Sequence, residues 1–400
     1  MKLLWVKSDF LHPTTRGGQI RSLEMLRRLH QRHEIHYVAF EDPSQPEGLA
    51  RSGEYAAHAY PVRHRVPPKQ SLAFAGQLVK GLFSPLPVAV SRYVSQAMLK
   101  KVVGLARKMH FDSIVCDFIF PALNLGDVLE RAVLFQHNVE TMIWRRHQEQ
   151  AGDPLRRLYF RLQAERMFDC EGALCRRARH VVAVSEIDAQ RMREMFGLKR
   201  VSAVATGVDS GYFRAPKSRP ETRFDIVFVG SMDWMPNQDG ALYFLKEILP
   251  RLRQAAPECT IGIVGRLPPA ELTRWGEHAG GVTVTGTVPD VRPYLWGAKI
   301  SVAPLRIGGG TRLKIYESMA AGTPVVATTI GAEGLDVSDG ENIRLADTPE
   351  DFASACAGLL KDPEQRARLA EAALERAATR FSWEAVTDRF EQILLEHADR

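Results

Sequence analysis

Short apolar runs alternate with longer amphipathic stretches along the whole chain. An apolar run of four to eight residues bounded by turn residues is typical of a buried strand, whereas a period of about 3.6 residues is typical of a helix. In the first half, strands are predicted at 3–7, 34–40, 113–116, 132–136 and 180–185. In the second half, they are predicted at 225–230, 260–265, 282–286, 299–305 and 324–328, each followed by a loop and a helical pattern. Repeated strand–helix units indicate parallel sheets that are covered by helices on both faces.

The two sets of strands predict an α/β protein with two doubly wound domains. Four hundred residues exceed one ordinary hydrophobic core, which supports the same division. Gly, Pro and Ser cluster between residues 207 and 223, so we place the linker there. The charged segment from Glu140 to Arg177 is helical in composition, and Pro154 is expected to break it.

The amino-acid composition indicates which class of protein this is and in which compartment it is expected. The chain is 45% hydrophobic and 25% charged, as soluble globular proteins are. Its five cysteines are scattered without CxxC spacing, which favours a reducing cytoplasm over a disulfide framework and suggests no metal site. The opening residues read as a buried strand rather than a signal peptide, and no apolar run is long enough to span a bilayer.

Positive charge is concentrated in one block. The net charge is +6, and residues 55–111 contain Lys and Arg but no Asp or Glu. Apolar residues between 72 and 83 are spaced to give a helix an apolar face and a cationic edge, which predicts contact with an anionic membrane surface. Three alternatives remain: a helix that covers the core, a mobile loop, or a groove for an anionic acceptor. Nucleic acid is not expected as a partner, because no binding module or platform of stacking aromatic residues is recognisable.

The segment from residue 308 to residue 328 places cations at the start of a predicted helix. Gly308, Gly309 and Gly310 form a loop, Thr311 is a suitable N-cap, and Arg312, Lys314 and Glu317 follow. A cation in the first turn is unfavourable by about 0.3–1 kcal/mol. A phosphate or diphosphate bound by the loop amides and by both side chains would reverse that sign. The alternative is a surface ion pair between Lys314 and Glu317.

Two segments of the first half carry further candidates, because ligands of doubly wound sheets bind outside the carboxyl ends of strands. Gly17 and Gly18 open a helix after the first strand, with Arg16 and Arg21 beside them, although a glycine pair also serves as a simple tight turn. His137 follows the strand at 132–136, and we expect it at the rim of a cleft as the leading polar catalytic candidate, where it could bond a substrate hydroxyl or polarise a reacting group. It could instead cap the next helix together with Asn138. Ser185 is expected to cap the helix that follows it.

These segments resemble the retaining, nucleotide-sugar-dependent glycosyltransferases of family four, which have the GT-B architecture. The resemblance is carried by the residues at 17–22, 136–140, 182–188, 207–213 and 228–237, and above all by APLRIGGGTRLKIYESMAAGTPVVAT at 303–328. It implies two Rossmann-like domains facing across a cleft: an acceptor-side domain at 1–207 and a nucleotide-sugar domain at 208–380. Residues 381–400, which begin with FSWEAV, would form a helix packed back on the first domain.

The resemblance also implies roles for single residues. Glu317 would accept from the ribose hydroxyls, and Arg312 and Lys314 would bind the diphosphate and stabilise the leaving group. Gly17 and Gly18 would approach the donor phosphates, and His137 would lie near the donor sugar. The other donor-binding positions implied are Gly230, Arg266, Val288, Tyr294, Gly308, Gly309, Gly310 and Thr311, with Val288 and Tyr294 near the base.

This sequence departs from the family pattern at two places. The family commonly has two glutamates separated by seven residues, but Gly309 stands where the first would be. Many members also carry an Arg and a Lys after the first strand of the second domain, whereas the segment from Gly230 to Asn237 has no cation. The phosphate charge would then depend on Arg312, Lys314 and Arg266. No acidic pair is placed to hold a metal, so neither a metal nor a cofactor is expected.

The predicted activity is transfer of a sugar from a UDP- or GDP-sugar to an acceptor hydroxyl with retention of configuration. The acceptor would be a glycan or a lipid-linked molecule in bacterial cell-surface glycan or glycolipid assembly, used in the cytoplasm or at the inner face of the cell membrane. Two other classes of protein remain open: a nucleotide-sugar epimerase of the same fold, and a non-catalytic sugar-nucleotide-binding protein, for which Gly309 is the best argument.

Overall fold

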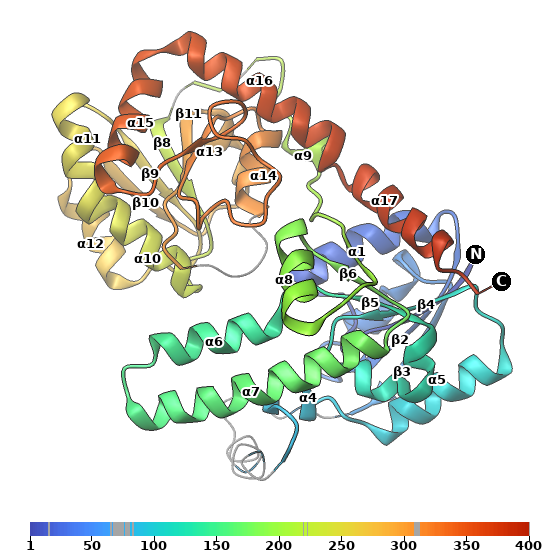
Figure 1. Ribbon diagram of the computed structural model, residues 1–400. Coiled ribbons are helices and arrows are strands. Elements are labelled where there is room, and N and C mark those ends of the chain that lie inside the picture. Colours follow the sequence, from blue (N-terminus) through green and yellow to red (C-terminus); the bar gives the residue numbers. More distant parts are fainter. Residues whose placement is uncertain are drawn as a thin grey trace. The chain divides into compact units, whose positions relative to one another are not determined.

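The computed structural model describes residues 1–14, 17–64, 66, 76, 81, 84–218, 220–221, 223–307 and 313–399. It divides into two compact units (Figure 1). The first unit comprises Met1–Ala205 together with Val386–Arg400, and the second comprises Thr206–Ala385. No helix among the described residues is long and apolar enough to cross a membrane.

The first unit is built on a parallel sheet of seven strands in the order β3-β2-β1-β4-β5-β6-β7. Its strands are β1 (Lys2–Val6), β2 (Glu34–Glu41), β3 (His58–Arg63), β4 (Ser113–Asp117), β5 (Ala132–Phe135), β6 (His180–Ala183) and β7 (Val201–Ala203). The order reverses between β1 and β4, which makes the carboxyl ends of these two strands the switch point where ligands of such sheets bind.

Helices connect these strands, as parallel pairing requires. They are α1 (Gly17–His30), α2 (Glu47–Ala50), the 3₁₀ helix η1 (Ser52–Glu54), α4 (Val88–Ser91), α5 (Gln96–Lys108), the 3₁₀ helix η2 (Ala122–Arg131), α6 (Glu140–Gln150), α7 (Pro154–Arg177) and α8 (Glu186–Phe196). The predicted break at Pro154 is confirmed, since α7 begins there with Asp153 as its N-cap. Ser185 caps α8 by accepting from the backbone N–H of Asp188, as predicted.

The second unit contains a parallel sheet of six strands in the order β10-β9-β8-β11-β12-β13. Its strands are β8 (Phe224–Val229), β9 (Ile261–Val264), β10 (Val282–Gly286), β11 (Ala298–Ala303), β12 (Val325–Ala327) and β13 (Arg344–Leu345). Here the order reverses between β8 and β11.

The helices of this unit flank its sheet (Figure 1). They are α9 (Ser210–Phe213), α10 (Met235–Tyr243), the π-helical η3 (Phe244–Ile248), α11 (Leu249–Ala255), α12 (Ala270–His278), α13 (Arg292–Trp296), α14 (Leu313–Ala320), α15 (Pro349–Lys361), α16 (Pro363–Arg380) and the start of α17 (Trp383–Glu396). From Val386 onward, α17 belongs to the first unit.

Every strand predicted from the sequence is present, and all pairings are parallel as predicted. The sequence missed β3, β7 and β13, which lie at sheet edges. Edge strands bury less of their surface and β7 and β13 have only three and two residues, so these strands carry weak apolar patterns.

Candidate functional site

A buried carboxylate lies at the switch point of the first sheet. Asp117 ends β4 and accepts hydrogen bonds from Lys7 Nζ at 2.8 Å, Trp5 Nε1 at 2.8 Å and Ser22 Oγ at 2.6 Å. The ammonium group of Lys7 and the neighbouring imidazole hold the pKa of Asp117 below its usual value despite burial. Asp117 is therefore an ionised acceptor that four side chains surround.

The fourth of these side chains is His137, two residues beyond the end of β5. Its Nε2 lies 2.6 Å from Asp117 Oδ1, and burial lowers its pKa to about 4. The ring is therefore neutral at neutral pH, with Nε2–H donating to Asp117 and Nδ1 left as an acceptor. Nδ1 is buried and makes no hydrogen bond with the part of the chain that the structure describes.

The position of His137 corrects two sequence expectations. Its ring is only 5% exposed, so it does not stand at an open rim. It does not cap the following helix either, because Val139 is the N-cap residue of α6. The reason is the network of Asp117, which draws the imidazole inward from the end of β5.

Gly17 and Gly18 form the first turn of α1, as predicted. A Cβ atom on Gly18 would lie 3.6 Å from His137 Nδ1, so the start of α1 faces the unpartnered nitrogen. Arg21 does not flank a ligand site. It is fully buried, its Nη1 donates to Gln136 O at 3.2 Å, and its guanidinium lies 4.3 Å above the Phe135 ring. Arg16 lies outside the described residues.

Two glycine loops meet at the carboxyl ends of β8 and β9, next to the switch point of the second sheet. Gly230 follows β8 and Gly265 follows β9, and the N–H of Gly230 donates to Val264 O at 2.9 Å. A Cβ atom on Gly265 would lie 1.7 Å from Gly230 O, which no side chain could tolerate. The close approach of these two backbones therefore requires glycine at position 265.

Lys314 reaches the same place from α14. Its Nζ donates to Asn237 Oδ1 on α10 and lies 4.5 Å from the centre of the Phe228 ring. A Cβ atom on Gly230 would be 2.8 Å from Nζ, so the ammonium lies directly against the backbone of the loop. The structure thus brings a cation from α14 to a glycine loop that lies far earlier in the sequence of the second unit.

Glu317 follows Lys314 by one turn of α14. Burial raises the pKa of its carboxyl group to about 7, and the charge of Lys314 opposes that rise. The loop residues Gly308, Gly309, Gly310 and Thr311, together with Arg312, lie outside the described residues.

Arg266 and Val288 also come from loops at the carboxyl ends of strands. Arg266 donates from Nε to Ser231 Oγ at 2.7 Å and pairs with Asp233 at 3.0 Å, so it braces the loop that follows β8. The carboxylate of Asp233 therefore balances the charge of Arg266, which we expected from the sequence to contribute to phosphate binding. Val288 follows β10 and is half-buried.

Tyr294 lies elsewhere. Its ring stacks on Phe224 with centroids 6.4 Å apart and planes 11° apart, and the Arg223 guanidinium lies 5.3 Å above it. Phe224 is the first residue of β8, whereas Gly230 follows the last. Six residues of strand span about 20 Å. The expectation that Tyr294 joins the other donor-binding positions is therefore wrong. Tyr294 lies on α13, directly before β11, and so at the amino ends of the strands, whereas Gly230 lies at their carboxyl ends.

One group of side chains in the described part of the chain could hold a metal ion. It consists of Glu34, His36 and His58 on β2 and β3, whose ligand atoms lie within 4.8 Å of one another. Glu34 and His36 begin β2, and His58 begins β3, so the group is at the amino ends of the strands. Asp117 and His137 follow carboxyl ends, so this group takes no part in the candidate site.

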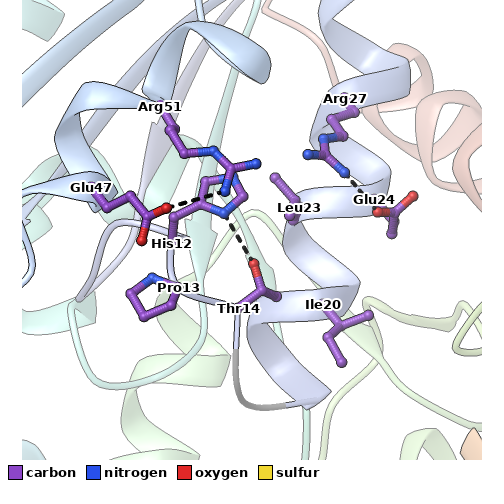
Figure 2. A pocket seen from close by; sticks show the side chains of 9 residues that line it. All are labelled: His12, Pro13, Thr14, Ile20, Leu23, Glu24, Arg27, Glu47 and Arg51. Atoms are coloured by element: carbon purple, nitrogen blue, oxygen red, sulfur yellow. Dashed lines mark hydrogen bonds and ion pairs between the residues drawn. The ribbon is translucent and has the colours of Figure 1, made fainter. Parts of the chain in front are cut away.

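An open cavity of about 410 Å³ lies beside α1 (Figure 2). The segment after β1 lines it with His12, Pro13 and Thr14, and α1 contributes its outward face. Its arginines are paired: Arg27 with Glu24 at 3.1 Å, and Arg51 with Glu54 at 2.5 Å. The remaining lining residues are Ile20, Leu23 and Glu47.

Sequence reasoning missed five polar residues of the two switch points and the cavity: Lys7, Ser22, Asp117, Asn237 and His12. Asp117 and Lys7 had a usable signal, since Asp117 comes directly after the strand predicted at 113–116 and Lys7 is the last residue of the strand predicted at 3–7. Ser22 and Asn237 had none, because their partners are distant in sequence.

Comparisons with known proteins bear on both units. Residues 15–212 match the model described as Glycosyltransferase Family 4, and residues 223–362 match the model described as Glycosyl transferases group 1. A D-inositol 3-phosphate glycosyltransferase from Nocardiopsis dassonvillei is 28% identical over 242 residues, which are 54% of this chain and 56% of the relative. The chain thus spans about half the length of the curated relatives it matches.

Solved structures match over almost the whole length. Sucrose-phosphate synthase from Thermosynechococcus elongatus superposes with a TM-score of 0.72 at 17% identity, covering 99% of this chain and 98% of that one. HepE from Anabaena in complex with UDP superposes with a TM-score of 0.70 at 16% identity, covering 99% and 100%. The two family models between them span most of the sequence, and the superpositions show that the matched structures share the fold of this chain. The chain belongs to glycosyltransferase family 4 and has the GT-B fold.

Proposed function

We propose that this protein transfers a sugar from a nucleoside diphosphate sugar to an acceptor hydroxyl with retention of anomeric configuration. The observation that carries the proposal is the ammonium group of Lys314 held against the Gly230 backbone at the switch point of the second sheet. A cation beside a glycine loop at the carboxyl end of a strand suits a diphosphate. The matched HepE structure holds UDP, which supports a UDP-sugar ahead of a GDP-sugar.

In this proposal the second unit binds the nucleotide. Lys314 and Arg312 neutralise the diphosphate, and the amides of residues 308–310 donate to it. Glu317 accepts from the ribose hydroxyls. Its raised pKa means that binding of two hydroxyl donors would favour the ionised carboxylate and draw its pKa back down. Val288 lies near the base.

The first unit acts on the sugar. His137 Nδ1 offers an acceptor to a sugar hydroxyl, and the start of α1 at Gly17 and Gly18 approaches the phosphates. The acceptor oxygen bonds to the anomeric carbon while the bond to the diphosphate oxygen breaks on the same face. The proton of the acceptor passes to the departing diphosphate, so neither an enzymatic nucleophile nor a metal is needed. Charge that is already in place at Lys314 lowers the barrier to departure.

For the acceptor we propose a glycan or a lipid-linked molecule of cell-surface glycan assembly, used at the inner face of the membrane. The similar D-inositol 3-phosphate glycosyltransferase supports a hydroxyl-bearing acceptor with an anionic group. Exposed Lys100 and Lys101 on α5 retain the basic character that suggested anionic lipid at 55–111. Most of residues 65–83 in that block lies outside the described residues.

Substitution of Lys314 tests the proposal. We expect Lys314→Ala to lower kcat/KM for transfer by at least about 100-fold, because a preorganised charge on the leaving group is lost. The matched control is Lys246→Ala, whose Nζ pairs with Glu271 on the surface of the same unit. Near-normal turnover by the Lys314 variant would contradict the assigned role.

Two further measurements separate the other classes. A thermal-shift series with UDP, GDP and their sugar conjugates identifies the base, because a ligand of the native state raises the unfolding temperature. Incubation of the donor without acceptor, followed by analysis of the sugar, detects an epimerase. A protein that binds the donor but neither transfers nor hydrolyses the sugar would be the non-catalytic alternative.

A further inference from the structure

The α6 and α7 helices form a long hairpin in the first unit, in which they lie side by side (Figure 1). Aromatic side chains fill the space between them. Phe160 of α7 lies 6.2 Å from the Trp144 ring and 5.5 Å from the His147 ring of α6. The first half of α7 is therefore held in place by α6, while its second half buries residues such as Met167 and Leu174 in the core.

The tip of this hairpin exposes leucines. All residues from 152 to 158 are exposed, and among them Leu155 is 78% and Leu158 is 64% exposed. These two residues are three apart in the first two turns of α7, so they share one face of the helix. Two neighbouring leucines this exposed on a rigid element form an apolar patch that nothing in the first unit's own packing requires.

Two arginines lie between the leucines in the sequence, to the sides of the face that the leucines share. These are Arg156 and Arg157, and both side chains are exposed. The nearby carboxylate of Asp153 is engaged by the backbone, since it accepts from the N–H groups of Leu155 at 2.7 Å and Arg156 at 3.1 Å. An apolar patch with arginines interleaved is complementary to an anionic lipid surface, because the leucines enter the acyl boundary while the guanidinium groups meet the headgroup phosphates.

The hairpin also has a fixed relation to the candidate site. α6 begins three residues after His137 and contains 11 residues. At 1.5 Å per residue, its far end is about 16 Å beyond its start. A surface that holds the tip would therefore lie at a distance on the order of the length of α6 from the helix end that follows His137.

We propose that the tip of the α6–α7 hairpin, through Leu155, Leu158, Arg156 and Arg157, inserts into an anionic membrane surface. The role of this contact rests on the proposed function: it would present a lipid-borne acceptor to the first unit. The contact itself is separate from the basic block at 55–111 and does not depend on catalysis.

Cosedimentation with vesicles tests the contact without any sugar nucleotide. The vesicles contain phosphatidylcholine alone or mixed with phosphatidylglycerol. The purified full chain should bind the mixed vesicles, and the double variant Leu155→Gln, Leu158→Gln should bind them at least about tenfold more weakly. The double variant Arg156→Gln, Arg157→Gln should also bind more weakly and should lose part of the salt dependence. The matched control is Ile187→Gln with Leu395→Gln, two exposed apolar residues of the same unit.

The outcomes are distinct. Vesicle binding that the leucine substitutions leave unchanged overturns the proposal. Gel filtration with light scattering tests a protein interface instead. If the wild-type chain is a dimer, and the leucine substitutions make it a monomer without changing vesicle binding, the proposal is overturned in favour of a protein interface. Transfer to a water-soluble acceptor should be unchanged in the leucine variant, so failure of the proposed function would appear there and not in the vesicle assay.

Discussion

His137 shows how one buried side chain can be chemically prepared by its neighbours. Asp117 accepts a hydrogen bond from Nε2–H, which leaves Nδ1 as an acceptor, and the ionised carboxylate is itself held by Lys7. Breaking such a pair on one side leaves an uncompensated buried charge, so the network constrains the ring as well as its protonation. The ring of His137 is therefore neutral at neutral pH, and its Nδ1 can accept a hydrogen bond from a hydroxyl group.

The lowered pKa of His137 predicts how the stability of the protein depends on pH. The folded value of about 4 is below the 6.5 of the unfolded chain, so the unfolded state binds more protons between these values. Stability should fall as pH decreases from about 6.5 to about 4, by up to about 3 kcal/mol for this one group. His137→Gln should lose that part of the dependence in urea unfolding at about pH 5 and pH 7. A variant whose two midpoints differ as much as those of the wild type would contradict the assignment.

At the scale of elements, the candidate site depends on how closely loops approach one another. The loops after β8 and β9 touch through Gly230 and Gly265, and α14 adds Lys314 to that contact. We expect Gly265→Ala to push the Gly230 backbone away and to weaken UDP binding in calorimetry by at least about tenfold. Gly280→Ala is the control, because a Cβ atom there meets nothing within 4 Å. Equal UDP affinity in the two variants would show that the loop tolerates the shift.

At the start of α6, Glu140 should make stability depend on pH in the sense opposite to His137. Burial and the charge of Glu171 raise the pKa of Glu140 to about 8, well above 4.5 for the unfolded chain. The folded state therefore holds the extra proton, and this contribution to stability is lost as pH rises from about 4.5 through about 8. Glu140→Gln should raise the unfolding temperature at about pH 9 relative to wild type, and should do so less at about pH 5.

A substitution of Glu171 serves as the comparison for Glu140→Gln. Its carboxylate accepts from the backbone N–H groups of Glu140 and Thr141 at 3.0 and 2.8 Å, so it holds the first turn of α6. Glu171→Gln should lower the unfolding temperature at both pH values, since an amide cannot replace all of these acceptor contacts. An identical pH profile for Glu140→Gln and wild type would refute the raised pKa.

At the scale of the whole molecule, the chain returns to its first unit. From Val386 onward, α17 packs there, and the Phe390 ring lies 4.7 Å from Phe135 and 5.8 Å from Trp5. The core of the first unit is thus completed by residues that follow the second unit in the sequence. Each unit has its own sheet and core, so each can lose stability separately.

Phe390→Ala should destabilise the first unit by about 3–5 kcal/mol, because it removes a fully buried ring. Hydrogen exchange followed by mass spectrometry should show lost protection in β1 and β5 and unchanged protection in β8 and β11. Phe352→Ala is the reciprocal variant, since Phe352 is buried in the core of the second unit. Loss of protection in both units on either substitution would mean that they unfold together.

Sequence alone determined what depends on local pattern. The ten predicted strands, the parallel class of both sheets, the break at Pro154 and the cap at Ser185 follow from periodicity and from the chemistry of helix ends, which act over a few residues. The glycines at 17 and 18 were found for the same reason. Family membership also followed, because its motifs are contiguous.

Only the tertiary structure decided which side chains meet. Asp117 and Lys7 are 110 positions apart, and Lys314 and Asn237 are 77 apart, yet strand order brings each pair together. The tertiary structure also places Tyr294 at the amino ends of the strands and buries His137 beside the Asp117 carboxylate. A sequence pattern specifies which end of a strand a residue follows, but the neighbour across the switch point depends on how the strands are ordered in the sheet.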